Sequence, residues 1–187
     1  MNYKYFLSTN VNFAVSKQEI CVIFSIFVIT FIVRFYDLGE VALNNDEAIY
    51  AGQAASLANF SEYQEQFSIF RAHPLLLQFM MSISFYFFGI NEFTARIVPM
   101  LLSCSSIVIS YFIAKFLYNQ RTAIISSIIL SLLPYHISIS KQALVDVSMS
   151  FFFVLSLLLI ILYYRKNSLF LLYGIGISTG LCFLSKE

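Results

Sequence analysis

Three carboxylates stand where they could transfer protons at the boundary of a membrane. Asp46 and Glu47 are adjacent in the acidic segment that follows the first apolar run, and Asp146 directly precedes a long apolar run. A carboxylate whose pKa is suitably tuned can accept the proton of a reacting hydroxyl group. Acidic side chains at membrane depth are costly and are therefore functional candidates. We accordingly take Asp46, Glu47 and Asp146 as candidate catalytic residues.

A structural alternative exists for each of these carboxylates, because negative charge stabilises the N-terminus of a helix. Residues 44–51 have the pattern of a helix start, with Asn45 as the expected cap and Asp46 and Glu47 in the first turn. Asp146 could in the same way be an N-terminal carboxylate of the helix that follows it. The sequence leaves both alternatives open.

Arg71 and His73 end the acidic segment just before Pro74, a residue that suits the first turn of a helix. An arginine at that place could hold a phosphate oxygen through two hydrogen bonds, and His73 would lie beside it. We therefore expect Arg71 and His73 to be substrate-binding residues. The structural alternatives are a snorkelling arginine for Arg71 and a capping or interfacial histidine for His73.

A divalent metal ion is compatible with these side chains. Carboxylate oxygens are the ligands that Mg²⁺ and Mn²⁺ prefer, so Asp46 and Asp146 could bind either ion. The sequence leaves open whether a metal is required, and no other cofactor is indicated.

The composition indicates a protein that lies mostly inside a bilayer. Of the 187 residues 59% are hydrophobic and 11% are charged, against about 25% charged residues in a typical soluble domain. A spanning helix needs about 20 mostly apolar residues. The runs without charge are 20–33, 72–91, 97–114, 122–140, 147–164 and 167–185. These runs predict an all-α fold, a polytopic transmembrane helical bundle.

We expect a single transmembrane domain over 1–187. Its first span is 19–36, an uncleaved signal anchor in which Arg34 snorkels to the interface. The long loop is 37–72, which should carry interfacial helices, and further membrane helices fill 73–187. Near the start of the latter part, Glu92 and Arg96 have the spacing of an ion pair within one helix.

Charge distribution predicts how the chain lies in the membrane. The long loop is acidic, whereas most of the short connections are basic, so the positive-inside rule places the N-terminus in the cytoplasm and the loop outside. This is the pattern of a multi-pass protein of the plasma membrane. If every run spans, Asp146 is cytoplasmic. We favour the topology in which one run between 72 and 140 fails to span, which returns Asp146 to the outer face, and Pro134 is a plausible place for the break.

Several short motifs, taken in order, resemble one family of membrane enzymes. They are Arg34-Phe35-Tyr36, Asn45-Asp46-Glu47, His73-Pro74-Leu75, Phe88–Glu92 with Ala95-Arg96, Ser140–Asp146 and Gly176–Lys186. Together they resemble the N-terminal part of the C-superfamily (GT-C) membrane glycosyltransferases, in the group of the protein O-mannosyltransferases and the lipid A aminoarabinose transferase.

The resemblance implies an inverting transfer of a sugar from a polyprenyl-phosphate carrier to a glycan, lipid or protein acceptor on the outer face. It further implies that Asp46 is the catalytic base, that Glu47 shapes the site and that Asp146 lies near it. Arg71 and His73 would face the carrier phosphate or the acceptor. Because such enzymes are usually several hundred residues long, we expect this chain to be an N-terminal fragment of a larger glycosyltransferase.

Other classes of function remain as alternatives. The chain could be a non-catalytic membrane subunit, a transporter-like protein, or a truncated transferase without activity. A transporter would place ionisable residues near the middle of the bilayer, whereas here the carboxylates gather at one interface. The net charge of +1 argues against a nucleic-acid partner.

Overall fold

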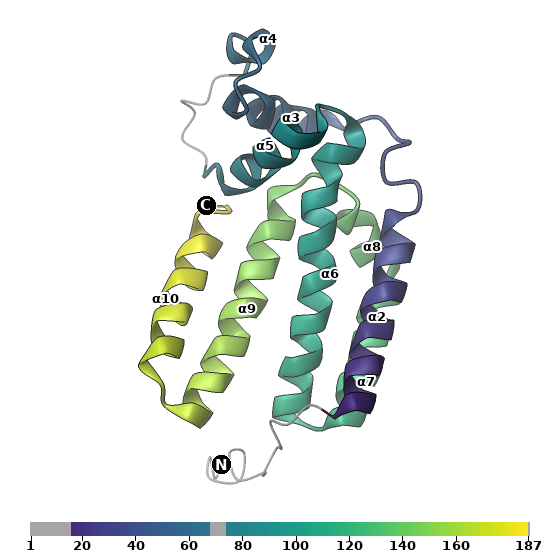
Figure 1. Cartoon of the computed structure of the whole chain (residues 1–187), viewed down its shortest axis with the longest axis vertical. Helices are drawn as coiled ribbons and strands as arrows, with labels where there is room; N and C mark the ends of the chain where they lie inside the picture. The colour runs from purple at the N-terminus through teal and green to yellow at the C-terminus, as the bar shows by residue number, and fades with distance from the viewer. Residues whose placement is uncertain (1–15, 68–73, 187) are drawn as a thin grey trace.

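The computed structural model describes residues 16–67 and 74–186, and all regular secondary structure in these ranges is helical. Figure 1 shows the arrangement of the helices. Their bounds are α2 (Lys17–Phe35), α3 (Asn45–Leu57), α4 (Ser61–Gln64), α5 (Leu76–Phe88), α6 (Glu92–Leu117), α7 (Gln120–Leu132), α8 (Pro134–Ser140), α9 (Val145–Lys166) and α10 (Leu169–Phe183). The predicted all-α class is confirmed.

The long helices run side by side along the long axis of the molecule, while α3, α4 and α5 gather at one end (Figure 1). Helix α6 lies at the centre and contacts α2, α7 and α9. In the described part of the chain, three helices are long and apolar enough to cross a membrane, namely α2, α6 and α9. The pair α7 and α8 is a broken fourth candidate, bent by 63°. The protein is therefore a polytopic helical bundle, as predicted.

Asparagine side chains fix where three of the helices begin. Asn44, Asn91 and Asn119 are the N-caps of α3, α6 and α7, and each side-chain oxygen accepts a hydrogen bond from the backbone N–H three residues later. Such a cap satisfies one of the N–H groups that the first turn leaves without a partner. The expected cap at Asn45 is wrong by one residue, since α3 already begins there.

The run at 72–91 forms a helix that is too short to span. Helix α5 has 13 residues, a length of about 20 Å, which is short of the roughly 30 Å of hydrocarbon. It packs instead against α3 beyond the end of the bundle, and the amide of Gln78 donates to the Gln53 oxygen at 3.0 Å. The break at Pro134 is also present, between α7 and α8. Asp146 consequently lies at the same end as the acidic loop, as the favoured topology requires.

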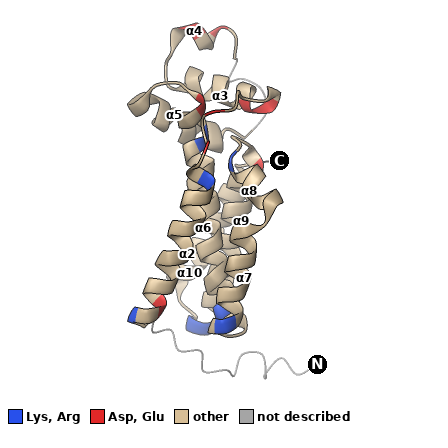
Figure 2. Ribbon diagram, turned by 90° about the vertical axis from the view of Figure 1, so that its right-hand side faces the viewer, with Lys and Arg blue, Asp and Glu red and all other residues tan. Residues whose placement is uncertain are grey.

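The two ends of the bundle differ in charge (Figure 2). We call the end that carries α3, α4 and α5 the acidic end, and the opposite end the basic end. Among the described residues, the acidic end carries Asp37, Glu40, Asp46, Glu47, Glu62, Glu65, Glu92 and Asp146 together with Arg96, Lys141 and Lys186, whereas the basic end carries Lys17, Lys115, Arg121, Arg165 and Lys166 together with Glu19. The asymmetry is the one that the positive-inside rule describes.

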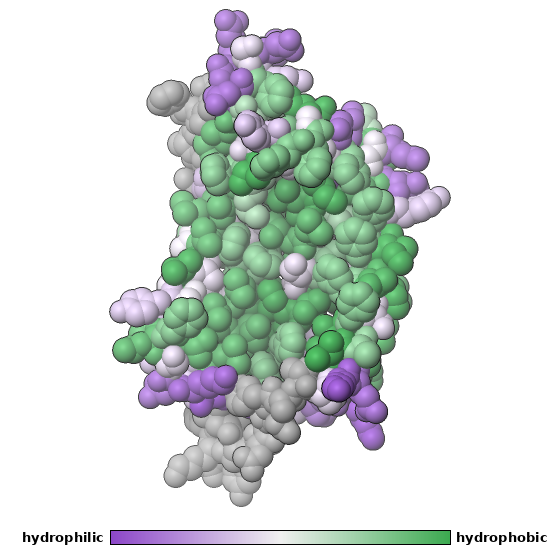
Figure 3. Space-filling model, in the orientation of Figure 1, coloured by the Kyte–Doolittle hydropathy of each residue, from purple (hydrophilic) through white to green (hydrophobic). Residues whose placement is uncertain are grey.

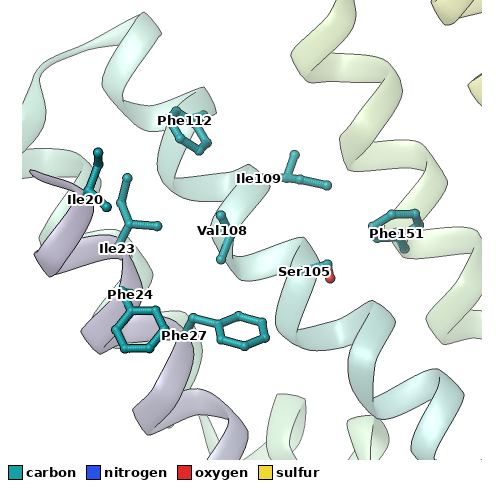
Figure 4. Close-up of a pocket in the computed structure, with 9 residues that line it drawn as sticks. All are labelled: Ile20, Ile23, Phe24, Phe27, Ser105, Val108, Ile109, Phe112 and Phe151. Atoms are coloured by element: carbon teal, nitrogen blue, oxygen red, sulfur yellow. The ribbon is translucent and has the colours of Figure 1, made fainter. Parts of the chain in front are cut away.

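Between these ends the surface is apolar (Figure 3). A groove of about 710 Å³ runs between α2, α6 and α9 and is lined by apolar side chains and Ser105 (Figure 4). Such a surface suits contact with hydrocarbon rather than with water, because burying apolar area in lipid avoids its exposure. The green region on the face shown in Figure 3 therefore has the chemistry of a surface that contacts lipid.

Labelling of single cysteines would test this orientation. We expect Glu62→Cys on α4 to react with a membrane-impermeant maleimide on intact cells, and Lys17→Cys at the start of α2 to react only after permeabilisation. The wild-type chain, with Cys21, Cys104 and Cys182, gives the background. Labelling of Lys17→Cys on intact cells would contradict the proposed orientation, and labelling of both positions from one side would contradict the bundle itself.

Candidate functional site

A buried ion pair between α3 and α6 organises the acidic end. Glu47 and Arg96 are both almost completely buried, and two parallel hydrogen bonds of 2.9 Å join the guanidinium Nε and Nη2 atoms to the two carboxylate oxygens. A planar guanidinium matches a carboxylate in this bidentate geometry. The spacing of Glu92 and Arg96 suggested a pair within α6, but the structure gives Arg96 this partner 49 residues away instead.

The same guanidinium holds the segment between α2 and α3. Its Nη1 atom donates to the carbonyl oxygens of Leu38 at 3.1 Å and Val41 at 2.7 Å, and its Nη2 atom donates to Ala42 at 3.2 Å. With the two bonds to Glu47, all N–H groups of Arg96 have acceptors. The loop that leads into α3 is therefore fixed by one side chain of α6.

Glu47 in turn joins α3 to the segment that leads into α9. Its Oε1 atom accepts the backbone N–H of Ala143 at 2.8 Å, and its Oε2 atom accepts that of Asn44 at 3.0 Å, which completes a capping box. Asn44 and Gln142 also share a side-chain hydrogen bond of 3.4 Å. The starts of α3 and α9 are thereby held together.

The environment of Glu47 keeps it ionised. Burial opposes the charged carboxylate, but the hydrogen bonds from Arg96, Ala143 and Asn44 outweigh burial, so the pKa of Glu47 lies below its ordinary value. A carboxylate with a lowered pKa and a full set of donors is poorly suited to accept a further proton. The geometry is that of a residue that positions its neighbours, while the predicted part of Glu47 in catalysis stays a prediction.

Asp46 and Asp146 are the second residues of the two helices that Glu47 joins. Both side chains are exposed at the acidic end. The Tyr50 hydroxyl lies near both carboxylates, one turn after Asp46. Its pKa is raised mainly by burial, and further by the negative charges of Asp46 and Asp146. The fold thus brings together two carboxylates that lie 100 residues apart in the sequence.

Lys186, the last residue that the structure describes, forms an ion pair with Asp146. Its Nζ atom lies 2.6 Å from an oxygen of Asp146, and the contact is about half exposed. This hydrogen bond, with the negative charge of Asp146, raises the pKa of Lys186. Asp46 has no such partner among the contacts of the described residues, which leaves its carboxylate accessible to a substrate.

The catalytic, substrate-binding and metal-binding roles predicted from the sequence remain untested. Arg71 and His73 lie outside the described residues, so their predicted contacts with phosphate or acceptor stay predictions. In the ranges 16–67 and 74–186, no three side chains of His, Cys, Asp or Glu form a group of the kind that holds a metal ion. Binding of Mg²⁺ or Mn²⁺ by Asp46 and Asp146 likewise stays a prediction.

Arg34 was expected to snorkel to the interface, and the structure shows otherwise. It is completely buried and faces the break between α7 and α8, where it donates to the carbonyl oxygen of Ser131 at 3.0 Å and contacts Nδ1 of His136 at 2.8 Å. The break between α7 and α8 leaves backbone carbonyl oxygens without helical N–H donors, and these oxygens stabilise the Arg34 guanidinium inside the bundle. The sequence-based search did not single out His136, although its position two residues after Pro134 was a usable signal.

Loss of the Glu47 charge should loosen the acidic end. We expect Glu47→Gln to lower the free energy of unfolding by about 3–5 kcal/mol, because it leaves a buried guanidinium without a counter-charge. Glu40→Gln, at an exposed position of the same loop, should stay within about 0.5 kcal/mol of the wild type. Thermal unfolding in detergent would measure both, and equal stabilities would refute the organising role of Glu47.

Comparison with known proteins identifies a relative of this chain and the family to which it belongs. An uncharacterized protein of Aquifex aeolicus (strain VF5) is 29% identical over 160 residues, which are 83% of this chain and 32% of that protein. The chain thus spans about a third of the length of this curated relative. No solved structure matches.

A family profile matches residues 72–187, which are more than half of the chain and include Asp146 and Arg96 but not Asp46. The family is one of membrane glycosyltransferases of the GT-C type, in agreement with the resemblance drawn from the short motifs. With a helical membrane bundle and this match, the chain belongs to the dolichyl-phosphate-mannose-protein mannosyltransferase family.

Proposed function

We propose that the chain is the N-terminal, base-bearing part of a glycosyltransferase that moves a sugar from a polyprenyl-phosphate carrier to an acceptor hydroxyl at the outer face of the plasma membrane. The observation that carries the proposal is the junction of α3 with the segment before α9, in which Glu47 accepts the N–H of Ala143. This junction joins the helix of Asp46 to the segment for which the family is shown.

In the proposed reaction Asp46 is the general base. The acceptor oxygen attacks the anomeric carbon of the carrier-linked sugar, the bond from that carbon to the phosphate oxygen breaks, and polyprenyl phosphate leaves. The proton of the acceptor hydroxyl passes to the Asp46 carboxylate. One displacement at one carbon inverts the anomeric configuration. Its accessible carboxylate supports Asp46 in this role over the buried Glu47.

Positive charge near the two aspartates would suit the carrier phosphate. Lys186 is bonded to Asp146 and about half exposed, while Nζ of Lys141 donates to the carbonyl oxygen of Tyr36 at 2.6 Å. Lys141 precedes the junction with Glu47 by two residues, which keeps its cation at the acidic end. We propose that these lysines, together with Arg71 and His73, attract the phosphate.

The membrane-facing surface supports a lipid-linked donor. An apolar groove of about 400 Å³ lies between α5 and α6, next to the acidic end, and is lined mainly by apolar side chains such as Ile83, Phe87 and Leu101. A polyprenyl chain is pure hydrocarbon and gains free energy from such a lining. The proposed donor would thus have its chain in the bilayer and its phosphate at the interface.

Removal of the proposed base should abolish transfer and leave the fold intact. We expect Asp46→Asn to lower the transfer of radiolabelled mannose from polyprenyl phosphomannose by at least about 10²-fold, the usual contribution of a general base. The assay uses the longest open frame that contains this chain, in native membranes. Glu40→Gln is the matched control, because it removes an exposed carboxylate from the same loop.

The unfolding temperature of Asp46→Asn should match that of the wild type, since the side chain is exposed. Transfer by Asp46→Asn at the wild-type rate would refute the assignment of the base. Absence of transfer by the wild type, with a complete frame, would favour a non-catalytic membrane subunit.

A further inference from the structure

Helix α5 exposes apolar side chains and buries its polar ones. Five of its large side chains are 48–75% exposed, and we call them the aromatic face: Phe79, Ile83, Tyr86, Phe87 and Phe88. The polar side chains of Gln78, Ser82 and Ser84 are at most 7% exposed. A helix at the surface of a soluble protein has the opposite arrangement, with polar residues toward water. The medium around the aromatic face should therefore be apolar.

The opposite face of α5 is occupied by α3. Leu77 and Met81 are fully buried in one apolar cluster with Ala54 and Ala55 of α3. The amide of Gln78 is also bonded to α3, through the side chain of Gln53. One side of α5 is thus packed within the protein, and only the aromatic face calls for a partner.

Contacts with α6 indicate how deep α5 lies. Helix α6 has no charged side chain over 97–114, a stretch of about 27 Å, which is close to the roughly 30 Å of hydrocarbon in a bilayer. The groove between the two helices is lined by Phe87 and Phe88 of α5 and by Ile97 and Leu101 of α6. The end of α5 therefore lies beside the first turns of the stretch of α6 that fits the hydrocarbon.

The chemistry of the aromatic face favours lipid over a protein partner. Protein interfaces have a polar rim, whereas residues 74–90 include no charged side chain. The groove also makes the aromatic face continuous with the membrane-facing surface of α6. Tyr86 adds a ring with a polar tip, the kind of side chain that gathers at the level of the lipid headgroups.

We propose that α5 is embedded in the leaflet at the acidic end, with its aromatic face against the acyl chains of phospholipids and its opposite face against α3. The inference goes beyond the proposed function and does not depend on it. It has a structural consequence for the acidic end. Because α3 packs on α5, an embedded α5 holds α3, with Asp46 in its first turn, at a constant height relative to the bilayer.

The depth of α5 can be measured with a single tryptophan, because the chain contains none. The whole chain is placed in nanodiscs of phosphatidylcholine that carries bromine high on its acyl chains, and iodide is added as the quencher in water. Phe87→Trp probes the aromatic face, and Phe88→Trp is the second variant if the first does not fold. Glu62→Trp, at an exposed position of α4, is the matched control for water. Phe153→Trp, at an exposed position of the long apolar helix α9, is the control for lipid.

We expect Phe87→Trp to lose at least about half of its emission to brominated lipid, because the apolar face of an interfacial helix lies roughly 5–10 Å inside the boundary. Phe153→Trp should behave in the same way, whereas Glu62→Trp should keep its emission. Iodide should quench Glu62→Trp strongly and Phe87→Trp only weakly. The unfolding temperatures should match that of the wild type, since each variant replaces an exposed side chain.

Two results would overturn the proposal. Quenching of Phe87→Trp by iodide to the same extent as Glu62→Trp would place α5 in water. Protection of Phe87→Trp from both quenchers would show that protein covers the aromatic face, either a partner or a second copy of the chain. Neither result bears on proton transfer by Asp46, so the proposed function would stand.

Discussion

The acidic end depends on one interaction, the buried ion pair of Glu47 and Arg96. Three segments distant in the sequence meet at it: the loop before α3, the second turn of α6 and the residues before α9. A buried ion pair is weak evidence of added stability, because desolvation offsets much of the attraction. Its value here is geometric, since every oxygen of the carboxylate and every N–H of the guanidinium has a fixed partner.

This constraint explains how a membrane protein can build a site from helices that do not all cross the bilayer. Helix α5 is too short to span and packs on α3, and the pair of α7 and α8 is bent by 63° at Pro134. Because α5 does not cross while α6 and the α7–α8 pair lead away from the acidic end and back to it, Asp46 and Asp146 lie on one side. Exposed carboxylates then stand above an apolar belt, where a donor with a hydrocarbon chain and a charged head would lie.

Much of the fold could be predicted from the sequence, because charge-free runs, proline and asparagine act locally. The acidic loop, the break at Pro134 and the helix start near Asp46 are of this kind. The partners of Arg96 and Arg34 could not be predicted in this way. The partner of Arg96 is Glu47 and that of Arg34 is His136, and both partners lie far away in the sequence. Residue spacing predicts only contacts between neighbours on one helix. The short length of α5 was missed because its run of apolar residues is longer than its helix.

The central claim is that the Glu47–Arg96 pair holds Asp46 beside Asp146. The most direct measurement is the distance between spin labels at Asp46→Cys and Asp146→Cys, with Cys21 and Cys182 replaced by serine and the buried Cys104 retained. With Glu47 and Arg96 intact, the account predicts a short and narrow distribution. With Glu47→Gln added, the distribution should broaden and shift to longer distances. A distribution that Glu47→Gln leaves unchanged would contradict the account.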